Sequence, residues 1–181
     1  MKIIYPTLIL SLLAPAAFAG DAAKSSAPND AEIAQIVLTA NRNEVDAGKT
    51  AKKMTKNLEV KELADMMITE HSSVADQTKD VAKKNKLKPT DSVASKDMQK
   101  EAKENAEKLK GMKGTDFDRE YVNQMVAAHQ AVLDSIDQTL LPNAKNEDLK
   151  ALLMKVRPAV ATHLQHAKAL QEKLGSATNA G

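Results

Sequence analysis

Hydrophobic residues recur every three or four positions from about residue 31 onward, the spacing that places them on one face of an α-helix. The first such stretch follows Asp30, which we predict as its N-cap, and breaks near Asn57. A second predicted helix covers about residues 59–86. It ends before Pro89, because the residue that precedes a proline disfavours the helical region.

The same spacing predicts further helices in the second half of the chain. A shorter helix at about residues 91–110 is rich in Lys, Glu and Ala, and its thin apolar stripe indicates a place on the outside or between two halves of the fold. The next helix begins at Thr115 or Asp116 and ends at Pro142, and the last covers about residues 146–174. We therefore predict an all-α fold, a four-helix bundle with one additional shorter helix.

The N-terminus has the features of a secretory signal peptide. Lys2 precedes an apolar run over residues 3–13, and Ala17-Phe18-Ala19 forms a small-x-small cleavage site. We predict cleavage after Ala19 and a periplasmic location; the alternative is an uncleaved anchor. No later segment is apolar enough to cross a bilayer. The predicted parts are a signal peptide at 1–19, a disordered lead-in at 20–30, the bundle domain at 31–174 and a disordered tail at 175–181.

The amino-acid composition limits the kinds of core, partner and reactive site that the protein can have. Aromatic residues make up only 2% of the chain, so Ala, Leu, Val, Ile and Met must fill the core. The 26 basic and 24 acidic residues nearly cancel, which gives no reason to expect a nucleic-acid partner. Cysteine is absent, which excludes thiol catalysis, disulfides and thiolate metal sites. A protein partner or a homo-oligomer remains compatible with this surface.

Each long predicted helix carries one ionisable residue in its apolar stripe. These residues are Glu44, His71, His129 and His163. Burying such groups unpaired is costly, so we expect them to meet one another, a water molecule or a metal ion. Glu70 is a candidate carboxylate for orienting one of the imidazoles.

Two interpretations of these four residues stay open. Three imidazoles and a carboxylate form a donor set that suits one ion of zinc, copper, iron or manganese, and bundle cores are where helical metalloproteins build such sites. Alternatively, the residues form a hydrogen-bonded layer that fixes how the helices pair. The geometry of the four side chains distinguishes the two.

Several motifs resemble those of domain of unknown function 4142, an exported bacterial family with a ferritin-like bundle fold. The run Gly114-Thr-Asp-Phe-Asp-Arg-Glu-Tyr-Val122 has the pattern G-x-x-F-D-x-x-Y-V, and Met125-Val126 with His129-Gln130 follows it. Asn43-Glu44-Val45, Met67-Ile-Thr-Glu-His71 and Pro158 with His163-Leu164 add to the resemblance, which covers about residues 31–174. It implies a ferritin-like fold and an export route, and it transfers no established activity.

A ferritin-like fold also raises the question of a di-iron site. That site needs a Glu from each of two helices and a Glu-x-x-His motif from each of the other two. Here Ile68 and Val160 stand three residues before His71 and His163, and Ala128 precedes His129. We therefore expect one transition-metal ion or none rather than a di-iron centre.

The functional prediction depends on which reactive residues the apolar stripes of the predicted helices contain and which they lack. No nucleophile–base pair and no paired carboxylates stand out, which favours a binding or stress-related module over an enzyme. The leading hypothesis is an exported, non-enzymatic helical bundle that acts as a binding or stress-related module, with a mononuclear metal site in its core as one option. The alternatives are a ferritin-like metalloenzyme of the oxidase or catalase kind, and a purely structural bundle with a polar histidine layer.

Overall fold

Helices account for nearly all of residues 27–176, the part of the chain that the computed structural model describes, and this range contains no strand. The longer helices are α1 (Asp30–Met54), α2 (Leu58–Lys84), α3 (Val93–Leu109), α4 (Gly114–Ser135) and α6 (Glu147–Ser176). A π-helical turn, η1 (Ile136–Leu140), and the short α5 (Leu141–Asn143) join α4 to α6. The predicted all-α fold is confirmed.

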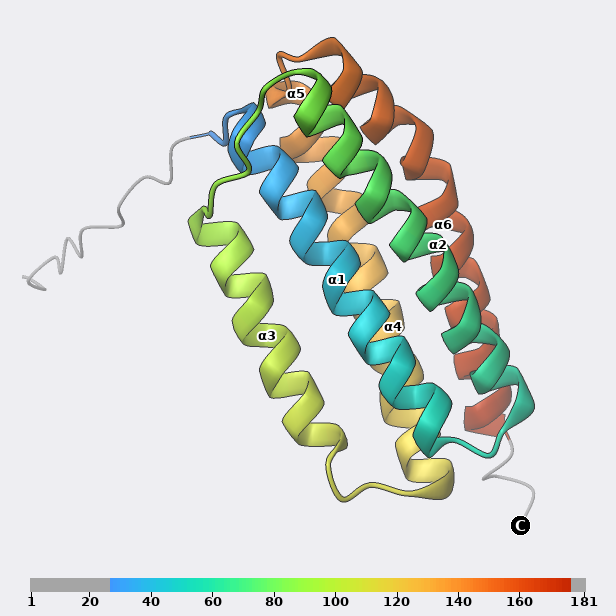
Figure 1. The fold of residues 1–181 in the computed structure, drawn as a ribbon. Coiled ribbons are helices and arrows are strands. Elements are labelled where there is room, and N and C mark those ends of the chain that lie inside the picture. The colour runs from blue at the N-terminus through green and yellow to red at the C-terminus, as the bar shows by residue number, and fades with distance from the viewer. Residues whose placement is uncertain (1–26, 177–181) are drawn as a thin grey trace, which may run out of the picture.

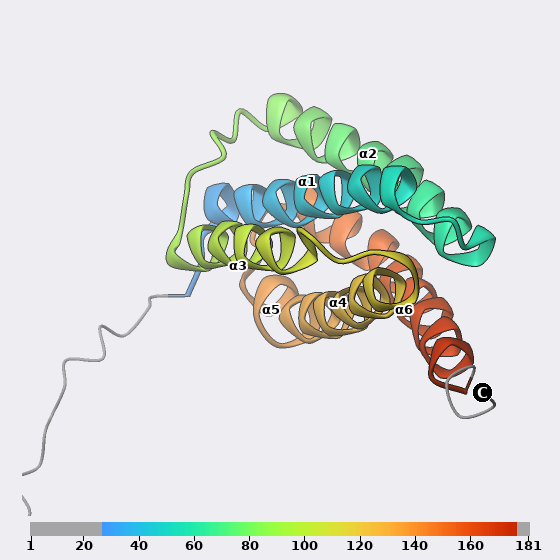
Figure 2. The same cartoon turned by 90° about the horizontal axis from the view of Figure 1, so that it is seen from below.

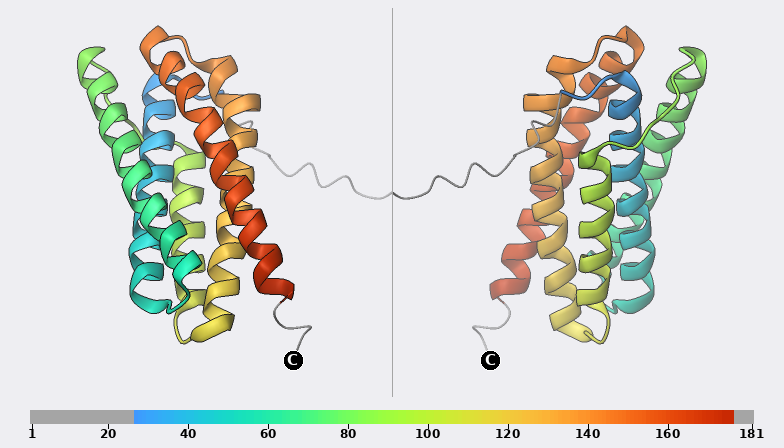
Figure 3. Two further views of the ribbon diagram at one scale, coloured as in Figure 1. Left: turned by 90° about the vertical axis from the view of Figure 1, so that its right-hand side faces the viewer. Right: turned by 90° about the vertical axis from the view of Figure 1, so that its left-hand side faces the viewer.

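Two antiparallel hairpins form the bundle (Figure 1). α1 packs along α2 and α4 along α6, while contacts of α2 with α6 and of α1 with α4 join the hairpins. The shorter α3 runs along the outside of α1 and also touches α4, as the end-on and side views show (Figures 2 and 3). This arrangement confirms the prediction of a four-helix bundle with an additional shorter helix, the latter bridging the two hairpins.

The first helix begins one residue before its predicted start. Asn29, not Asp30, is the N-cap, because its side chain accepts hydrogen bonds from the backbone N–H groups of Ala31 and Glu32. Glu32 returns a hydrogen bond to the Asn29 N–H and completes a capping box. The Asp30 carboxylate instead accepts from the backbone N–H of Lys145, 2.8 Å away, and ties the start of α1 to the loop before α6.

The start of α4 also differs from the prediction. The helix begins at Gly114, whose positive φ of 56° suits a residue without a Cβ. Thr115 and Asp116 therefore lie inside the first turn, and Lys113 occupies the cap position without a side-chain hydrogen bond. Side-chain chemistry alone favoured Thr or Asp, whereas the backbone turn at Gly114 determines where the helix starts.

The core has two hydrophobic clusters, one toward each end of the bundle. Met67, Met125 and Ala167 belong to the cluster near the α1–α2 loop. Val74, Val132 and Val160 belong to the cluster near η1. On α2, α4 and α6 a histidine stands between the two clusters, so the histidines occupy a layer across the middle of the bundle.

Hairpin α1–α2 is closely packed at Gly48. A Cβ placed on this residue would lie 3.0 Å from the backbone oxygen of Ala64 and 3.0 Å from Cγ1 of Ile68. The absence of a side chain thus lets α2 approach α1 just before His71, which places that histidine against α1.

Some predictions fall outside the described range. The signal peptide at 1–19 and most of the lead-in and tail lie in residues 1–26 and 177–181. Within the described range, Asp30 and Gly175 are helical rather than part of the lead-in or tail. Between residues 27 and 176, no helix combines the length and apolar character that crossing a bilayer would require.

Candidate metal centre

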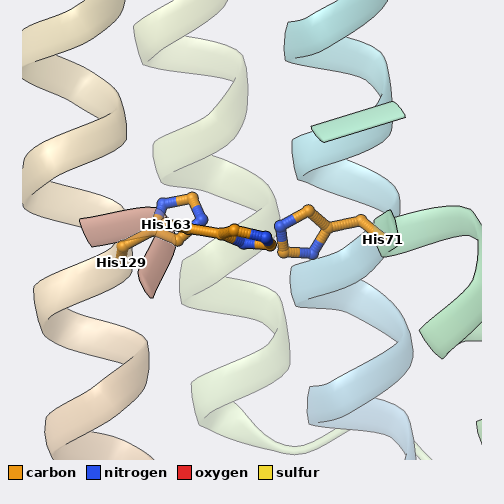
Figure 4. A group of neighbouring side chains, drawn as sticks. All are labelled: His71, His129 and His163. Carbon is orange, nitrogen blue, oxygen red and sulfur yellow. The ribbon is translucent and has the colours of Figure 1, made fainter. Parts of the chain in front are cut away.

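Three of the four histidines meet at the centre of the bundle. His71 comes from α2, His129 from α4 and His163 from α6, and all three are buried. Their ring centroids lie 5.2 to 5.5 Å apart. One nitrogen from each ring lies within 4.8 Å of those of the other two. Figure 4 shows the three rings directed toward one another from separate helices.

The outer nitrogen of His71 is held by α1. Its Nδ1 lies 2.9 Å from Oδ1 of Asn41, a buried residue. The amide nitrogen of Asn41 donates to the backbone oxygen of Val37 at 2.7 Å, so the oxygen of this amide is the atom that faces the imidazole. His71 therefore carries its proton on Nδ1 and keeps a lone pair on Nε2.

The other two histidines are oriented in the same manner. Nδ1 of His129 donates to the backbone oxygen of Met125 at 2.9 Å, one turn earlier on α4. Nε2 of His163 lies 3.0 Å from the half-exposed carboxylate of Glu70 on α2. Glu70 thus contacts an imidazole, although it orients His163 on the opposite hairpin and not its sequence neighbour His71.

The inner nitrogens of the three rings have no partner. Nε2 of His71, Nε2 of His129 and Nδ1 of His163 are buried, and none has a hydrogen-bond partner among residues 27–176. Each is the nitrogen left with a lone pair when the outer nitrogen donates. Buried polar atoms are seldom left unsatisfied, because losing hydration without a replacement costs about 1–3 kcal/mol for each atom.

Burial also keeps two of these imidazoles neutral. Burial, together with the neighbouring His129 and His163, lowers the pKa of His71 to about 3. Burial lowers the pKa of His129 to about 4; the hydrogen bond to Met125 opposes this shift and the nearby His163 adds to it. Neutral imidazole is the form that binds a metal ion, so both rings are ready to act as ligands at neutral pH.

Glu44 lies beside the histidines but does not belong to the close group. Its side chain, on α1, is 7% exposed and lines the cavity next to the three rings. The group of ligand atoms within 4.8 Å contains the histidines alone among the described residues. Burial raises the pKa of Glu44 to about 8, so the carboxyl group is protonated at neutral pH. The sequence predicted four converging donors. The structure brings the three histidines together and places Glu44 beside them as a neutral carboxyl.

The cavity beside the histidines has a volume of about 60 Å³. All three histidines and Glu44 contribute to its wall. The remaining wall is mainly apolar and receives side chains from α1, α2, α3, α4, α6 and the η1 turn. The cavity therefore joins a cluster of nitrogen donors to a hydrophobic space.

Sequence reasoning missed Asn41 and the carbonyl of Met125. The sequence feature that could have identified Asn41 is its position one turn before Glu44 on the buried side of α1. The role of a backbone carbonyl has no signature in the side-chain pattern. His166, the remaining histidine, is exposed on α6 and lies outside the group.

Comparison with known proteins gives a family and no activity. The profile described as "Domain of unknown function (DUF4142)" matches residues 14–170. No curated protein and no solved structure matches the chain. The match covers most of the 181 residues, including all three core histidines. The chain therefore belongs to the DUF4142 family.

Proposed function

We propose that this protein binds one divalent transition-metal ion through His71, His129 and His163. One observation carries the proposal: three buried imidazoles present unpartnered nitrogens to one another while each outer nitrogen is engaged in a hydrogen bond. Hydrogen bonds of this kind hold metal-binding histidines in place and set which nitrogen binds. Three nitrogen donors suit zinc, and also iron(II), cobalt(II) or copper(II).

A purely structural histidine layer explains the geometry less well. A self-sufficient layer matches donors with acceptors, whereas the three inner nitrogens here are all acceptors. A single water molecule has two hydrogens to donate, so a hydrogen-bonded layer would need a third donor, such as the protonated Glu44 carboxyl, to satisfy all three nitrogens. A metal ion accepts a lone pair from each of the three and satisfies them together.

The donor set argues against di-iron chemistry. Ferritin-like oxidases and manganese catalases hold their metals with several carboxylates. The close group in the described part of the chain consists of imidazoles only, and the neighbouring Glu44 is protonated at neutral pH. A mononuclear site is the proposal that these residues support.

The predicted signal peptide supports a periplasmic setting for this site. Lys2, the apolar run and the Ala17-Phe18-Ala19 cleavage site suit export, and the lack of cysteine suits an oxidising compartment. We propose that the exported protein acts as a metal-binding module of the cell envelope.

Isothermal titration of the exported protein with zinc tests the proposal. The protein is purified from the periplasm without a His tag and stripped with a chelator. We expect one equivalent to bind and to raise the melting temperature, as ligands that bind only the folded state do. His166→Gln is the matched control, since that imidazole is exposed on the same helix as His163. The proposal fails if zinc, cobalt(II), iron(II) and copper(II) all leave the melting temperature unchanged, or if His129→Leu binds as tightly as the wild type.

A further inference from the structure

The cavity beside the histidines extends away from them into an apolar space. Its wall there includes Ile36 of α1, Ile136 and Leu140 of η1, and Leu153 and Val156 of α6. We call the space between these five residues and the three histidines the apolar chamber. Because a charged guest would lose its hydration among these five side chains, the part of the chamber away from the histidines selects against ions.

The volume of the chamber limits what it can hold. One water molecule occupies about 10–15 Å³ of such a cavity, and the cavity has about 60 Å³. The space therefore fits a molecule of a few heavy atoms. Cavities with apolar walls bind apolar guests such as xenon.

The η1 turn forms part of the chamber wall. Ser135, Ile136 and Leu140 line the cavity at the point where α4 changes from α-helical to π-helical geometry. A π-helical turn widens the helix locally and is frequent at functional sites. Here it turns two large apolar side chains toward the histidine layer.

We propose that the apolar chamber binds a small uncharged molecule of the diatomic-gas class, such as nitric oxide or dioxygen, next to the open coordination position of the bound metal. This inference rests on the proposed function. Three protein ligands leave a tetrahedral ion with one free position, which is the arrangement of metal sites that bind a further ligand. The same cavity is lined by all three histidines and by the apolar wall, so a guest in the chamber borders the metal.

A groove beneath α3 borders the chamber. Small side chains line it from both sides, including Ala102 of α3 and Ala128 of α4. Ala40, Met98 and Val132 line both this groove and the chamber. The groove and the chamber therefore adjoin each other at these side chains.

Xenon binding tests the chamber without any metal. Hyperpolarised ¹²⁹Xe NMR on the metal-free exported protein should show a bound-xenon signal. Ala159→Leu adds a larger side chain to the chamber wall and should abolish this signal, while Ala161→Leu, half-buried on the same helix but outside the wall, should retain it. The absence of bound xenon in the wild type would overturn the inference and leave the proposed metal site standing.

Nitric oxide tests the same chamber with metal present. Iron(II)-loaded protein under anaerobic conditions should give the EPR signal of a non-haem iron nitrosyl, and Ala159→Leu should weaken nitric oxide binding at least tenfold while iron(II) affinity stays within twofold. Iron-loaded wild type that binds no nitric oxide would overturn the inference alone. Protein that binds none of zinc, cobalt(II), iron(II) and copper(II) would overturn the proposed function and this inference with it.

Discussion

Asn41 on α1 accepts a hydrogen bond from Nδ1 of His71 on α2, with 2.9 Å between the two atoms. Because the Asn41 amide nitrogen is engaged with the Val37 carbonyl, the amide cannot turn over without losing a second hydrogen bond. One contact between neighbouring helices thus decides that Nε2 of His71 faces the centre of the bundle.

Replacing Asn41 with Ala should weaken metal binding while the protein stays folded. Loss of an outer hydrogen-bond partner typically lowers metal affinity about 10- to 100-fold. Titration with zinc of the stripped variant measures the change. Asn43→Ala is the control, since Asn43 also donates to a backbone carbonyl, that of Met98 on α3, but does not contact a histidine. Equal zinc affinity in Asn41→Ala and wild type would contradict the orienting role.

Replacing His129 with Leu should change the melting temperature differently in metal-free protein and in the presence of zinc. In metal-free protein the substitution removes one of three facing acceptors and adds apolar contact, so the melting temperature should stay the same or rise. In the presence of zinc the variant should lose the stabilisation that the wild type gains. Differential scanning calorimetry with and without zinc measures both effects. A clear fall in stability of the metal-free variant would favour a structural histidine layer instead.

The stability of the metal-free protein should pass through a maximum near pH 6.5. His71 and His129 have folded pKa values of about 3 and about 4 against 6.5 in a free side chain, so the unfolded state takes up more protons below pH 6.5 and stability falls as pH drops. Glu44, at about 8 against 4.5, keeps a proton that the unfolded state releases, so stability also falls as pH rises toward 8. Each group changes the free energy of unfolding by at most about 1.4 kcal/mol per pH unit.

Urea unfolding with a chelator present, from pH 4.5 to 8, measures this profile. Between pH 4.5 and 6.5 the stabilisation that the two histidines gain with rising pH exceeds the stabilisation that Glu44 loses. The free energy of unfolding therefore reaches its maximum near pH 6.5. Glu44→Gln should flatten the alkaline side and steepen the acidic side, because the carboxyl opposes the two histidines between pH 4.5 and 6.5. A profile that is flat from pH 7.5 to 5 would show that these groups are not buried as the structure has them.

Gly48→Ala should destabilise the α1–α2 hairpin. The added Cβ would lie 3.0 Å from the Ala64 carbonyl oxygen, which belongs to a helix backbone and cannot move aside alone. Overpacking of this kind costs about 1–3 kcal/mol. Chemical unfolding measures the difference, and Gly175→Ala is the control because a Cβ there meets nothing within 4 Å. A Gly48→Ala variant as stable as wild type would show that the helices have room to separate.

Much of the site was predictable because helical periodicity is a local property. The spacing of apolar residues puts His71, His129 and His163 in the buried faces of three helices, and the structure brings them together. The spacing also puts Glu44 in a buried face, but its height relative to the histidines depends on how α1 slides along α2. That offset depends on contacts between the two helices, among them the close approach at Gly48, and not on the pattern within either helix.

The remaining features depend on contacts between helices or on the backbone. Glu70 was predicted to orient an imidazole, but its partner on α6 follows from the packing of α2 against α6. The η1 turn has no Gly or Pro within it, so the apolar spacing of Ile136 and Leu140 indicates an ordinary helix. The predicted N-cap of α1 was wrong because Asn29 and Asp30 are both good caps, and the signal that favours Asn29 is Glu32, which stands three residues later and completes a capping box.

Anomalous diffraction at the zinc absorption edge tests the central claim most directly. Crystals of zinc-loaded protein should show one strong anomalous peak in the middle of the bundle, about 2.0–2.1 Å from one nitrogen of each of the three histidines. The bonding nitrogens should be Nε2 of His71, Nε2 of His129 and Nδ1 of His163. A histidine layer with no peak, or a zinc peak only at the exposed His166, would contradict the account.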